Sequence, residues 1–202
     1  QDILARAIYN EVDLVLVVSG MYLHPDWMVL MRKAGLRVGV MLTESPYDDL
    51  RQGPFIQYAD IVWTNERTSA NFLKQWNLNT FYLPHAYDPE RHFATPVGPE
   101  FDYIQSHEVL FVGTGFEERI ELLSEVDWDG IDVRLYGTWE LLGPRNRLRK
   151  YVTDEFVDNR VSALMYKKSA INLNIYRTSV GFGRNTKRIE DAESMNPRVL
   201  EL

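Results

Sequence analysis

The stretch VLFVGTGFEERIELL, residues 109–123, decides the fold. It opens with four apolar residues, turns through Gly113, Thr114 and Gly115, and continues with the three- and four-residue apolar spacing of a helix from about Phe116. A buried strand that passes through a short glycine turn into a helix is the opening of a strand–helix–strand unit. The stretch therefore predicts an α/β domain built on a parallel sheet.

The same pattern recurs along the chain. Six further apolar runs of strand length are nearly continuous rather than alternating with polar residues, which is typical of strands buried on both faces of a parallel sheet. They lie within residues 13–20, 38–44, 60–65, 80–85, 132–137 and 170–177. Helical patterns separate them, at residues 25–35, 66–76, 116–126 and 159–168. The alternation predicts a doubly wound α/β architecture.

One segment interrupts this alternation. Residues 88–107 contain three prolines, one glycine and no hydrophobic period, which is typical of a linker. We therefore expect two Rossmann-like domains, residues 1–95 and 108–202, joined by a linker at residues 96–107. A single seven-stranded sheet is the alternative that the sequence leaves open.

The composition narrows the functional classes. The net charge is −7 and the pI is near 5.2, which argues against binding through an overall basic surface. The chain has no cysteine, and its four histidines lack metal-ligand spacing, so we expect no metal site. No apolar run reaches the roughly 18–20 residues of a membrane span, and no signal peptide opens the chain. We expect a cytoplasmic protein.

The turn after the strand at residue 109 is the first candidate site. Ligands of open α/β sheets bind at the carboxyl ends of strands, where backbone N–H groups and a helix N-terminus favour phosphate. Gly113, Thr114 and Gly115 supply that turn, and Arg119 could reach a diphosphate with two hydrogen bonds. Because a third glycine is missing from the dinucleotide-binding pattern, a purely structural turn is an equal alternative.

A second candidate lies near the C-terminal end, at residues 176–198. It follows the last predicted strand, so its basic residues are placed to contact an anion, although a solvated loop is the alternative. They are Arg177, Arg184, Lys187, Arg188 and Arg198. Asn196 and Pro197 have the pattern of a helix start. That helix carries Glu201, whose carboxylate could accept two ribose hydroxyls or simply suit the helix dipole.

In the first half, Glu44 and His85 each follow a predicted strand. They are the candidate general bases at the carboxyl edge of that sheet. We expect two other polar residues to be structural: His24 at a helix start beside Pro25, and Asp88 in a turn before Pro89. The basic cluster of residues 145–150 could contact a phosphate backbone, but a solvated helix face is the favoured interpretation.

Five stretches, in this order, resemble the CgeB-like (spore-maturation-type) glycosyltransferases of the GT-B fold. They are VGVMLTESPYDD (38–49), ADIVWTNERTS (59–69), FYLPHAYDPERH (81–92), VLFVGTGFEER (109–119) and NPRVLEL (196–202). The resemblance implies two Rossmann-like domains facing across a cleft and transfer of a sugar from a UDP- or GDP-linked donor, without a cofactor. Gly113–Gly115, Arg119 and Arg198 would approach the diphosphate, and Glu201, in the motif that Asn196 opens, would hold the ribose.

The chain also departs from that family pattern. Glu44-Ser-Pro46 stands where the family usually carries Asp-x-Pro, and no glycine-rich first strand precedes Asp13. We therefore expect a chain that is incomplete at both ends. The acceptor, the stereochemistry and the oligomeric state stay open. Alternatives are a phage-type DNA base glycosyltransferase, a non-catalytic GT-B-like structural or binding module, and a nucleotide-sugar epimerase.

Overall fold

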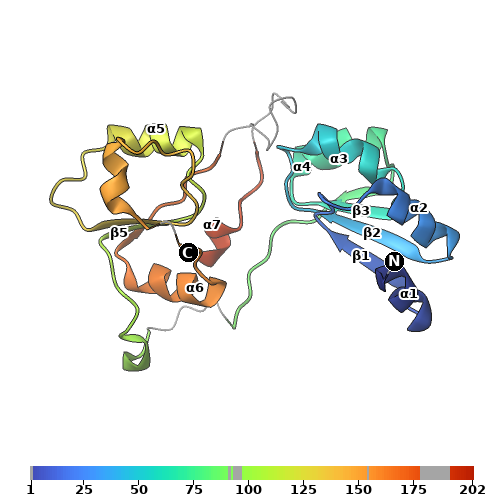
Figure 1. The fold of residues 1–202 in the computed structure, drawn as a ribbon, viewed down its shortest axis with the longest axis horizontal. Coiled ribbons are helices and arrows are strands. Elements are labelled where there is room, and N and C mark those ends of the chain that lie inside the picture. The colour runs from blue at the N-terminus through green and yellow to red at the C-terminus, as the bar shows by residue number, and fades with distance from the viewer. Residues whose placement is uncertain (1, 91, 93–96, 154, 178–191) are drawn as a thin grey trace. The chain divides into compact units, whose positions relative to one another are not determined.

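The chain forms two compact units in a computed structural model that describes residues 2–90, 92, 97–153, 155–177 and 192–202. The first unit contains the described residues up to His85 together with residues 192–195. The second contains the described residues of 86–177 and Asn196–Leu202. Each unit has its own sheet and core (Figure 1), and each is described by itself. The limits 1–95, 96–107 and 108–202 stay a prediction.

The first unit is built on a sheet of four parallel strands in the order β1-β2-β3-β4. The strands are β1 (Leu14–Val18), β2 (Arg37–Leu42), β3 (Ile61–Thr64) and β4 (Thr80–Tyr82). The helices are α1 (Asp2–Tyr9), α2 (Pro25–Lys33), α3 (Asp49–Ile56) and α4 (Arg67–Phe72), and a 3₁₀ turn (Leu73–Gln75) extends α4. Figure 1 shows α2 and α3 on the same side of the sheet.

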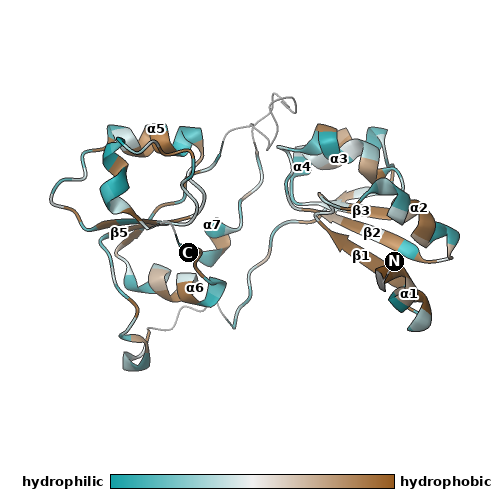
Figure 2. Ribbon diagram, in the orientation of Figure 1, coloured by the Kyte–Doolittle hydropathy of each residue, from teal (hydrophilic) through white to brown (hydrophobic). Residues whose placement is uncertain are grey.

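Apolar side chains from this side of the sheet make the core of the first unit. Val38, Val40 and Leu42 of β2 are buried against Met28 of α2 and Ile56 of α3. Burying each such side chain contributes roughly 1.5–3 kcal/mol relative to an exposed one. In Figure 2 the strands are the hydrophobic parts of the ribbon, whereas the helices carry polar residues as well.

The prediction that the strands are buried on both faces is wrong for β1. Leu14, Leu16 and Val18 alternate with residues that pack on the core, and they are 46%, 48% and 58% exposed. These three side chains lie on the face of β1 that does not pack on the core, and β1 lies at the edge of the sheet, paired only with β2 in its described part. A continuous apolar run does not reveal this position, because edge and central strands can share a composition.

Helix α3 was not expected, because Gly53 and Pro54 usually end helices. Here they lie inside it. Gly53 is needed for packing: a Cβ at this position would come within 2.5 Å of the Trp76 ring. The packing of Gly53 against Trp76, which a side chain at position 53 would prevent, thus outweighs the low helix propensity of glycine and proline.

The second unit has four parallel strands in the order β7-β6-β5-β8. They are β5 (Val109–Val112), β6 (Val133–Tyr136), β7 (Val152–Thr153) and β8 (Ile171–Asn172). The helices are α5 (Glu117–Glu125), α6 (Asn159–Lys168) and α7 (Arg198–Glu201), and 3₁₀ turns span Pro99–Phe101 and Arg147–Tyr151. Helices α5 and α6 lie on opposite sides of the sheet (Figure 1).

This arrangement buries β5 on both faces. Phe111 packs into the core with Leu123 of α5, and Leu110 packs into a second core with Met165 of α6. The structure confirms the predicted α/β class with two parallel sheets, and the alternative of one seven-stranded sheet is wrong. The last predicted strand is much shorter than residues 170–177, because only β8 pairs with β5.

The described segment of residues 192–195 is held on the first unit by one carboxylate. Glu66 is 1% exposed and stands at the N-cap of α4, where it accepts hydrogen bonds from the N–H and hydroxyl of Thr68. Its oxygens also accept from the N–H groups of Glu193 and Ser194, at 3.1 and 3.0 Å, and from the Ser194 hydroxyl. Glu66 therefore joins two segments that are 127 residues apart.

Candidate functional site

The turn that follows β5 is packed directly against the turn that follows β6. The N–H groups of Gly113 and Gly115 donate to the carbonyls of Tyr136 and Thr138, each at 2.9 Å. Gly137 has φ +112°, and a Cβ there would lie 2.5 Å from the carbonyl oxygen of Gly113. Hydrogen bonds of the fold therefore already use the Gly113 and Gly115 amides, and contact of this turn with a diphosphate stays a prediction.

Arg119, predicted to reach a diphosphate, braces this turn. It is 8% exposed, and its Nε donates to the carbonyl of Ile175 at 3.0 Å while Nη1 donates to the carbonyl of Thr114 at 2.9 Å. Its guanidinium also lies over the rings of Phe111 and Phe116. Arg119 thus links the turn after β5 to the segment after β8, and contact with a diphosphate stays a prediction.

Arg198 lies at the same carboxyl end of β5. Its Nη2 donates to the carbonyl of Val112 and lies 2.8 Å from the position that a Gly113 Cβ would take. Its guanidinium covers the Phe111 ring at 4.9 Å, and its Nε donates to the hydroxyl of Tyr166 at 3.5 Å. Any side chain at position 113 would displace this guanidinium, so the glycine at this position has a local reason.

Two neighbours complete this part of the site. Burial raises the pKa of the Tyr166 hydroxyl, and the nearby Arg198 guanidinium offsets part of that rise. Asn196 donates through Nδ2 to the Asn174 side chain at 2.9 Å, and its Oδ1 accepts from the N–H of Val199 at 3.3 Å. The predicted N-cap interaction of Asn196 is therefore present. Glu201 is half-buried on α7 and close enough to affect Tyr166 electrostatically.

A third arginine joins Arg119 and Arg198. The guanidinium of Arg177 lies 5.2 Å from the centre of the Phe116 ring, and that of Arg119 lies 5.1 Å from it. We call Arg119, Arg177 and Arg198 the arginine cluster. Guanidinium groups gathered at one strand end match the phosphate oxygens of an anionic ligand in charge and hydrogen-bonding geometry. Glu117 and Glu118 in the first turn of α5 oppose anion binding at that helix end.

Sequence reasoning missed the residues that support the cluster. Tyr166, Asn174 and Tyr176 hold the α7 region through side-chain contacts with Arg198 and Asn196. Their only signal in the sequence is their position on or after the last helix and strand, which does not specify a partner. The sequence also does not predict the close approach of Gly137 to Gly113, because a single glycine after a strand can occur for many structural reasons.

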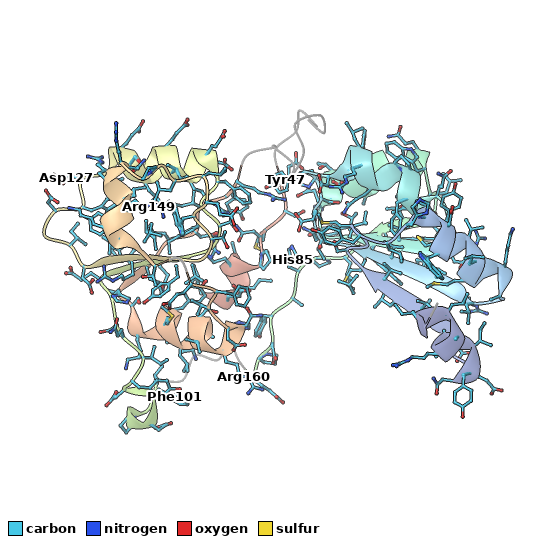
Figure 3. All side chains as sticks on the ribbon, in the orientation of Figure 1. Tyr47, His85, Phe101, Asp127, Arg149 and Arg160 are labelled. Atoms are coloured by element: carbon cyan, nitrogen blue, oxygen red, sulfur yellow. The ribbon has the colours of Figure 1, made fainter. Side chains whose placement is uncertain are left out.

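The two candidate bases of the first unit come from neighbouring parts of one sheet edge. Glu44 follows β2 and is half-buried, and its carbonyl accepts from the N–H of Asp48. His85 follows β4 and is also half-buried. Figure 3 labels His85 and Tyr47, which lie at the same end of this unit. Because β3 stands between β2 and β4, Glu44 and His85 are set apart by two strand spacings of about 4.8 Å each.

Both residues that we expected to be structural are so. His24 caps α2, where its Nδ1 accepts from the N–H of Asp26 at 3.3 Å. Asp88 forms a turn, in which its Oδ1 accepts from the N–H of Glu90 at 3.0 Å.

The basic cluster of residues 145–150 is largely engaged with its own unit. Arg147 donates to the carbonyl of Val126 at 3.0 Å, and Arg149, labelled in Figure 3, donates to the carbonyl of Leu142. Lys150 bonds to Asp129 at 2.8 Å, which raises the pKa of the lysine and lowers that of the aspartate. These contacts hold the 3₁₀ turn on the loops after β6 and α5, so this segment is not a plain solvated helix face.

No group of three or more His, Cys, Asp or Glu side chains among the described residues is arranged to hold a metal ion. No helix among those residues is long and apolar enough to cross a membrane. The Arg184, Lys187 and Arg188 part of the predicted basic loop lies outside the described residues.

Comparisons with known proteins agree with this architecture. No family model matches the chain. The chain is 26% identical over 197 residues to the spore protein CgeB of Bacillus subtilis (strain 168), covering 94% of this chain and 60% of that protein. A Listeria monocytogenes structure described as a UDP-N-acetylglucosamine 2-epimerase superimposes with a TM-score of 0.52 at 12% identity, covering 85% of this chain and 53% of that one.

The chain thus spans about three fifths of its curated relative and about half of the structural one. At 12% identity the structural match speaks only for the fold. Both matches extend over most of this chain, and the fold has two parallel α/β sheets in two units. The chain is therefore similar to CgeB over most of its length, and its two parallel α/β sheets agree with the GT-B fold.

Proposed function

We propose that this protein is a glycosyltransferase that moves a sugar from a nucleoside-diphosphate donor, linked to UDP or GDP, to an acceptor hydroxyl. The observation that carries the proposal is the arginine cluster at the carboxyl end of β5. The position is the one where α/β sheets bind ligands, and guanidinium groups suit phosphate oxygens. The similarity to CgeB also supports this proposal.

The main task of the protein in this reaction is to stabilise the leaving group. The acceptor oxygen forms a bond to the anomeric carbon while the bond from that carbon to the donor phosphate oxygen breaks. The electron pair leaves with the nucleoside diphosphate, so negative charge develops on the phosphate. Arg198 and Arg177 would stabilise this charge, while Arg119 keeps the turn and the segment after β8 in place.

The proton of the acceptor hydroxyl must also be removed. If the anomeric configuration inverts, a base takes that proton, and Glu44 is our first candidate because it follows β2 in a half-buried position. His85 is the second candidate. If the configuration is retained, neither residue has to act as a base. Glu201 on α7 would hold the donor ribose, since its two carboxylate oxygens can each accept from a hydroxyl.

A thermal-shift titration tests donor binding. UDP or GDP is expected to raise the melting temperature of the protein, because a ligand that binds only the folded state stabilises it. Arg198→Gln is expected to weaken this shift strongly. Arg145→Gln is the matched control, because Arg145 is an exposed arginine of the same unit away from the cluster. A titration in which neither nucleotide changes the melting temperature would remove the basis of the proposal.

Product analysis separates the proposal from its alternatives. Release of UDP or GDP together with a glycosylated product identifies a transferase, and Glu44→Gln is expected to slow turnover while nucleotide binding persists. An epimerase would change the sugar of the donor without an acceptor. A non-catalytic module would bind nucleotide without turnover. A DNA acceptor would show salt-dependent duplex binding that is lost when Arg145, Arg147 and Arg149 are neutralised.

A further inference from the structure

The first unit contains a cavity that the proposed donor site does not use. It has a volume of about 160 Å³ and lies at the carboxyl end of β1, between the loops that lead into α2 and α3. Its lining residues are Ser19, Gly20, Met21, Leu23, Pro25, Asp48, Arg51, Gln52 and Phe55. With roughly 30 Å³ per water in the liquid, this volume corresponds to about five waters, which suits a single small ring.

Two polar side chains in the wall have no hydrogen-bond partner among the described residues. Asp48 is 0% exposed, and neither of its carboxylate oxygens is bonded. Gln52 is 4% exposed, and neither its amide nitrogen nor its amide oxygen is bonded. Leaving such a group buried and unsatisfied costs about 1–3 kcal/mol, and more for a charged one. No contact among the described residues therefore explains why this pair is buried.

A helix-capping role does not account for Asp48. It stands at the N-cap of α3, where an aspartate usually accepts a hydrogen bond from the first turn, yet its side chain makes no such bond. Asp48 is instead one of the residues that line the cavity. The loop opposite is also unusual, because Ser19 has a positive φ of +63° directly before Gly20 at +72°. Backbone strain of this kind is frequently found at ligand sites.

The side chains that line the cavity indicate which class of ligand it can bind. A carboxylate only accepts hydrogen bonds, whereas the Gln52 amide both donates and accepts, so a ligand with several hydroxyl groups can satisfy both side chains. Leu23, Pro25 and Phe55 add apolar surface for the C–H face of a ring. An anion would be repelled by Asp48.

We infer that this cavity binds one sugar ring of a carbohydrate acceptor, with Asp48 and Gln52 forming hydrogen bonds to its hydroxyl groups. As an acceptor site the inference rests on the proposed transferase activity, and it names the acceptor that this activity leaves open. Glu44 precedes Asp48 in the same loop, and the two are joined by the hydrogen bond from the Asp48 N–H to the Glu44 carbonyl. A ring in this cavity would thus lie beside the loop that carries the first candidate base.

Methyl NMR of protein labelled at the methionine methyl groups tests the inference. Met21 lines the cavity, whereas Met165 belongs to the core of the second unit and serves as an internal reference. Glucose, galactose, mannose and N-acetylglucosamine are titrated in turn. At least one of them is expected to shift the Met21 signal in a saturable manner and to leave the Met165 signal in place.

Substitutions identify the contacts. Asp48→Asn keeps the shape of the side chain and removes its charge, and it is expected to weaken sugar binding by about tenfold or more, since hydrogen bonds to charged groups are the stronger ones. Gln52→Met removes the amide nitrogen and oxygen at similar volume and is expected to weaken binding as well. Asp13→Asn, an exposed aspartate that precedes β1, is the matched control with unchanged affinity.

Several results would overturn the inference: no Met21 shift with any of the four sugars, equal affinity in the Asp48→Asn variant, or a Met21 shift with Mg²⁺ or spermidine alone. The nucleotide titration separates this test from that of the proposed function. If sugars bind at Met21 but UDP and GDP do not bind the protein, the cavity assignment holds and its role as an acceptor site is overturned. If nucleotides bind and sugars do not, the donor site stands and the cavity assignment fails.

Discussion

Arg119 shows how the environment of one residue decides its role. Its place one turn into α5 suggests an anion ligand, but its Nε and Nη1 donate to the carbonyls of Ile175 and Thr114. An arginine in this position holds two loops together and, through them, shapes the surface that Arg177 and Arg198 share. Arg119→Ala is therefore expected to lower the stability of the ligand-free protein in addition to weakening nucleotide binding.

Gly137→Ala tests the contact between the two turns of the second unit. Alanine at a φ of +112° is strained, and its Cβ would lie 2.5 Å from the Gly113 carbonyl oxygen. We expect the free energy of unfolding to fall by about 2 kcal/mol or more, measured by urea denaturation. Two controls separate the causes: Gly130 has φ +83° with open space around it, and Gly143 has open space alone. A loss no larger than that of Gly130→Ala would show that backbone strain suffices and that the close approach adds nothing.

Asp48→Asn tests how much the buried Asp48 carboxylate lowers the free energy of unfolding. Because the buried carboxylate has no hydrogen-bond partner among the described residues, its neutral isostere is expected to raise the free energy of unfolding by about 1 kcal/mol or more. Chemical denaturation without sugar measures the change, with Asp13→Asn as the reference. A less stable Asp48→Asn protein would mean that the carboxylate has a structural partner. Stabilisation together with lost sugar binding is the signature of a residue kept for its ligand.

At the scale of elements, α4 depends on a cap that also serves a distant segment. Glu66 is the N-cap of α4 and accepts from Glu193 and Ser194 as well. The sequence indicates a helix start near Glu66 but gives no sign of its second role. Only the folded chain brings residues 193–194 to a carboxylate that lies after β3.

Glu66→Gln tests this link. The glutamine places a donor amide among donors, so we expect faster hydrogen exchange at the amides of Glu193 and Ser194. We also expect a loss of about 1–3 kcal/mol in the free energy of unfolding, in the range for hydrogen bonds to charged groups. Hydrogen-exchange mass spectrometry or NMR measures the first effect. Glu11→Gln, at an exposed glutamate of the same unit, is the control. Unchanged exchange at residues 193 and 194 would mean that other contacts hold the segment.

At the scale of the molecule, two units with separate sheets and cores divide the proposed work. The second unit carries the arginine cluster, and the first carries Glu44, His85 and the cavity. The general rule that ligands bind at the carboxyl edge of α/β sheets applies to both. The predicted cleft between two facing domains stays a prediction.

Hydrogen exchange under nucleotide binding tests this division. A saturating concentration of the nucleoside diphosphate that binds is expected to slow exchange in the turn after β5 and in the first turns of α5. A ligand present at about 100 times its Kd adds about 2.7 kcal/mol of stability to the unit that binds it. Exchange in the buried strand β2 of the first unit is the comparison. Protection confined to the first unit would contradict the proposal, because the proposed donor site lies in the second unit.

The sequence by itself determined the α/β class and the strand–helix alternation, and it placed the candidate loops after strand ends. Continuous apolar runs and glycine turns report directly on local backbone and burial, and parallel strands place their following loops at one edge. Only the tertiary structure decided that the Gly113 and Gly115 amides form hydrogen bonds within the fold, and that Asp48 and Gln52 line a cavity without hydrogen-bond partners among the described residues. Hydrogen-bond partners and buried space depend on residues far apart in the chain, and no local pattern encodes them.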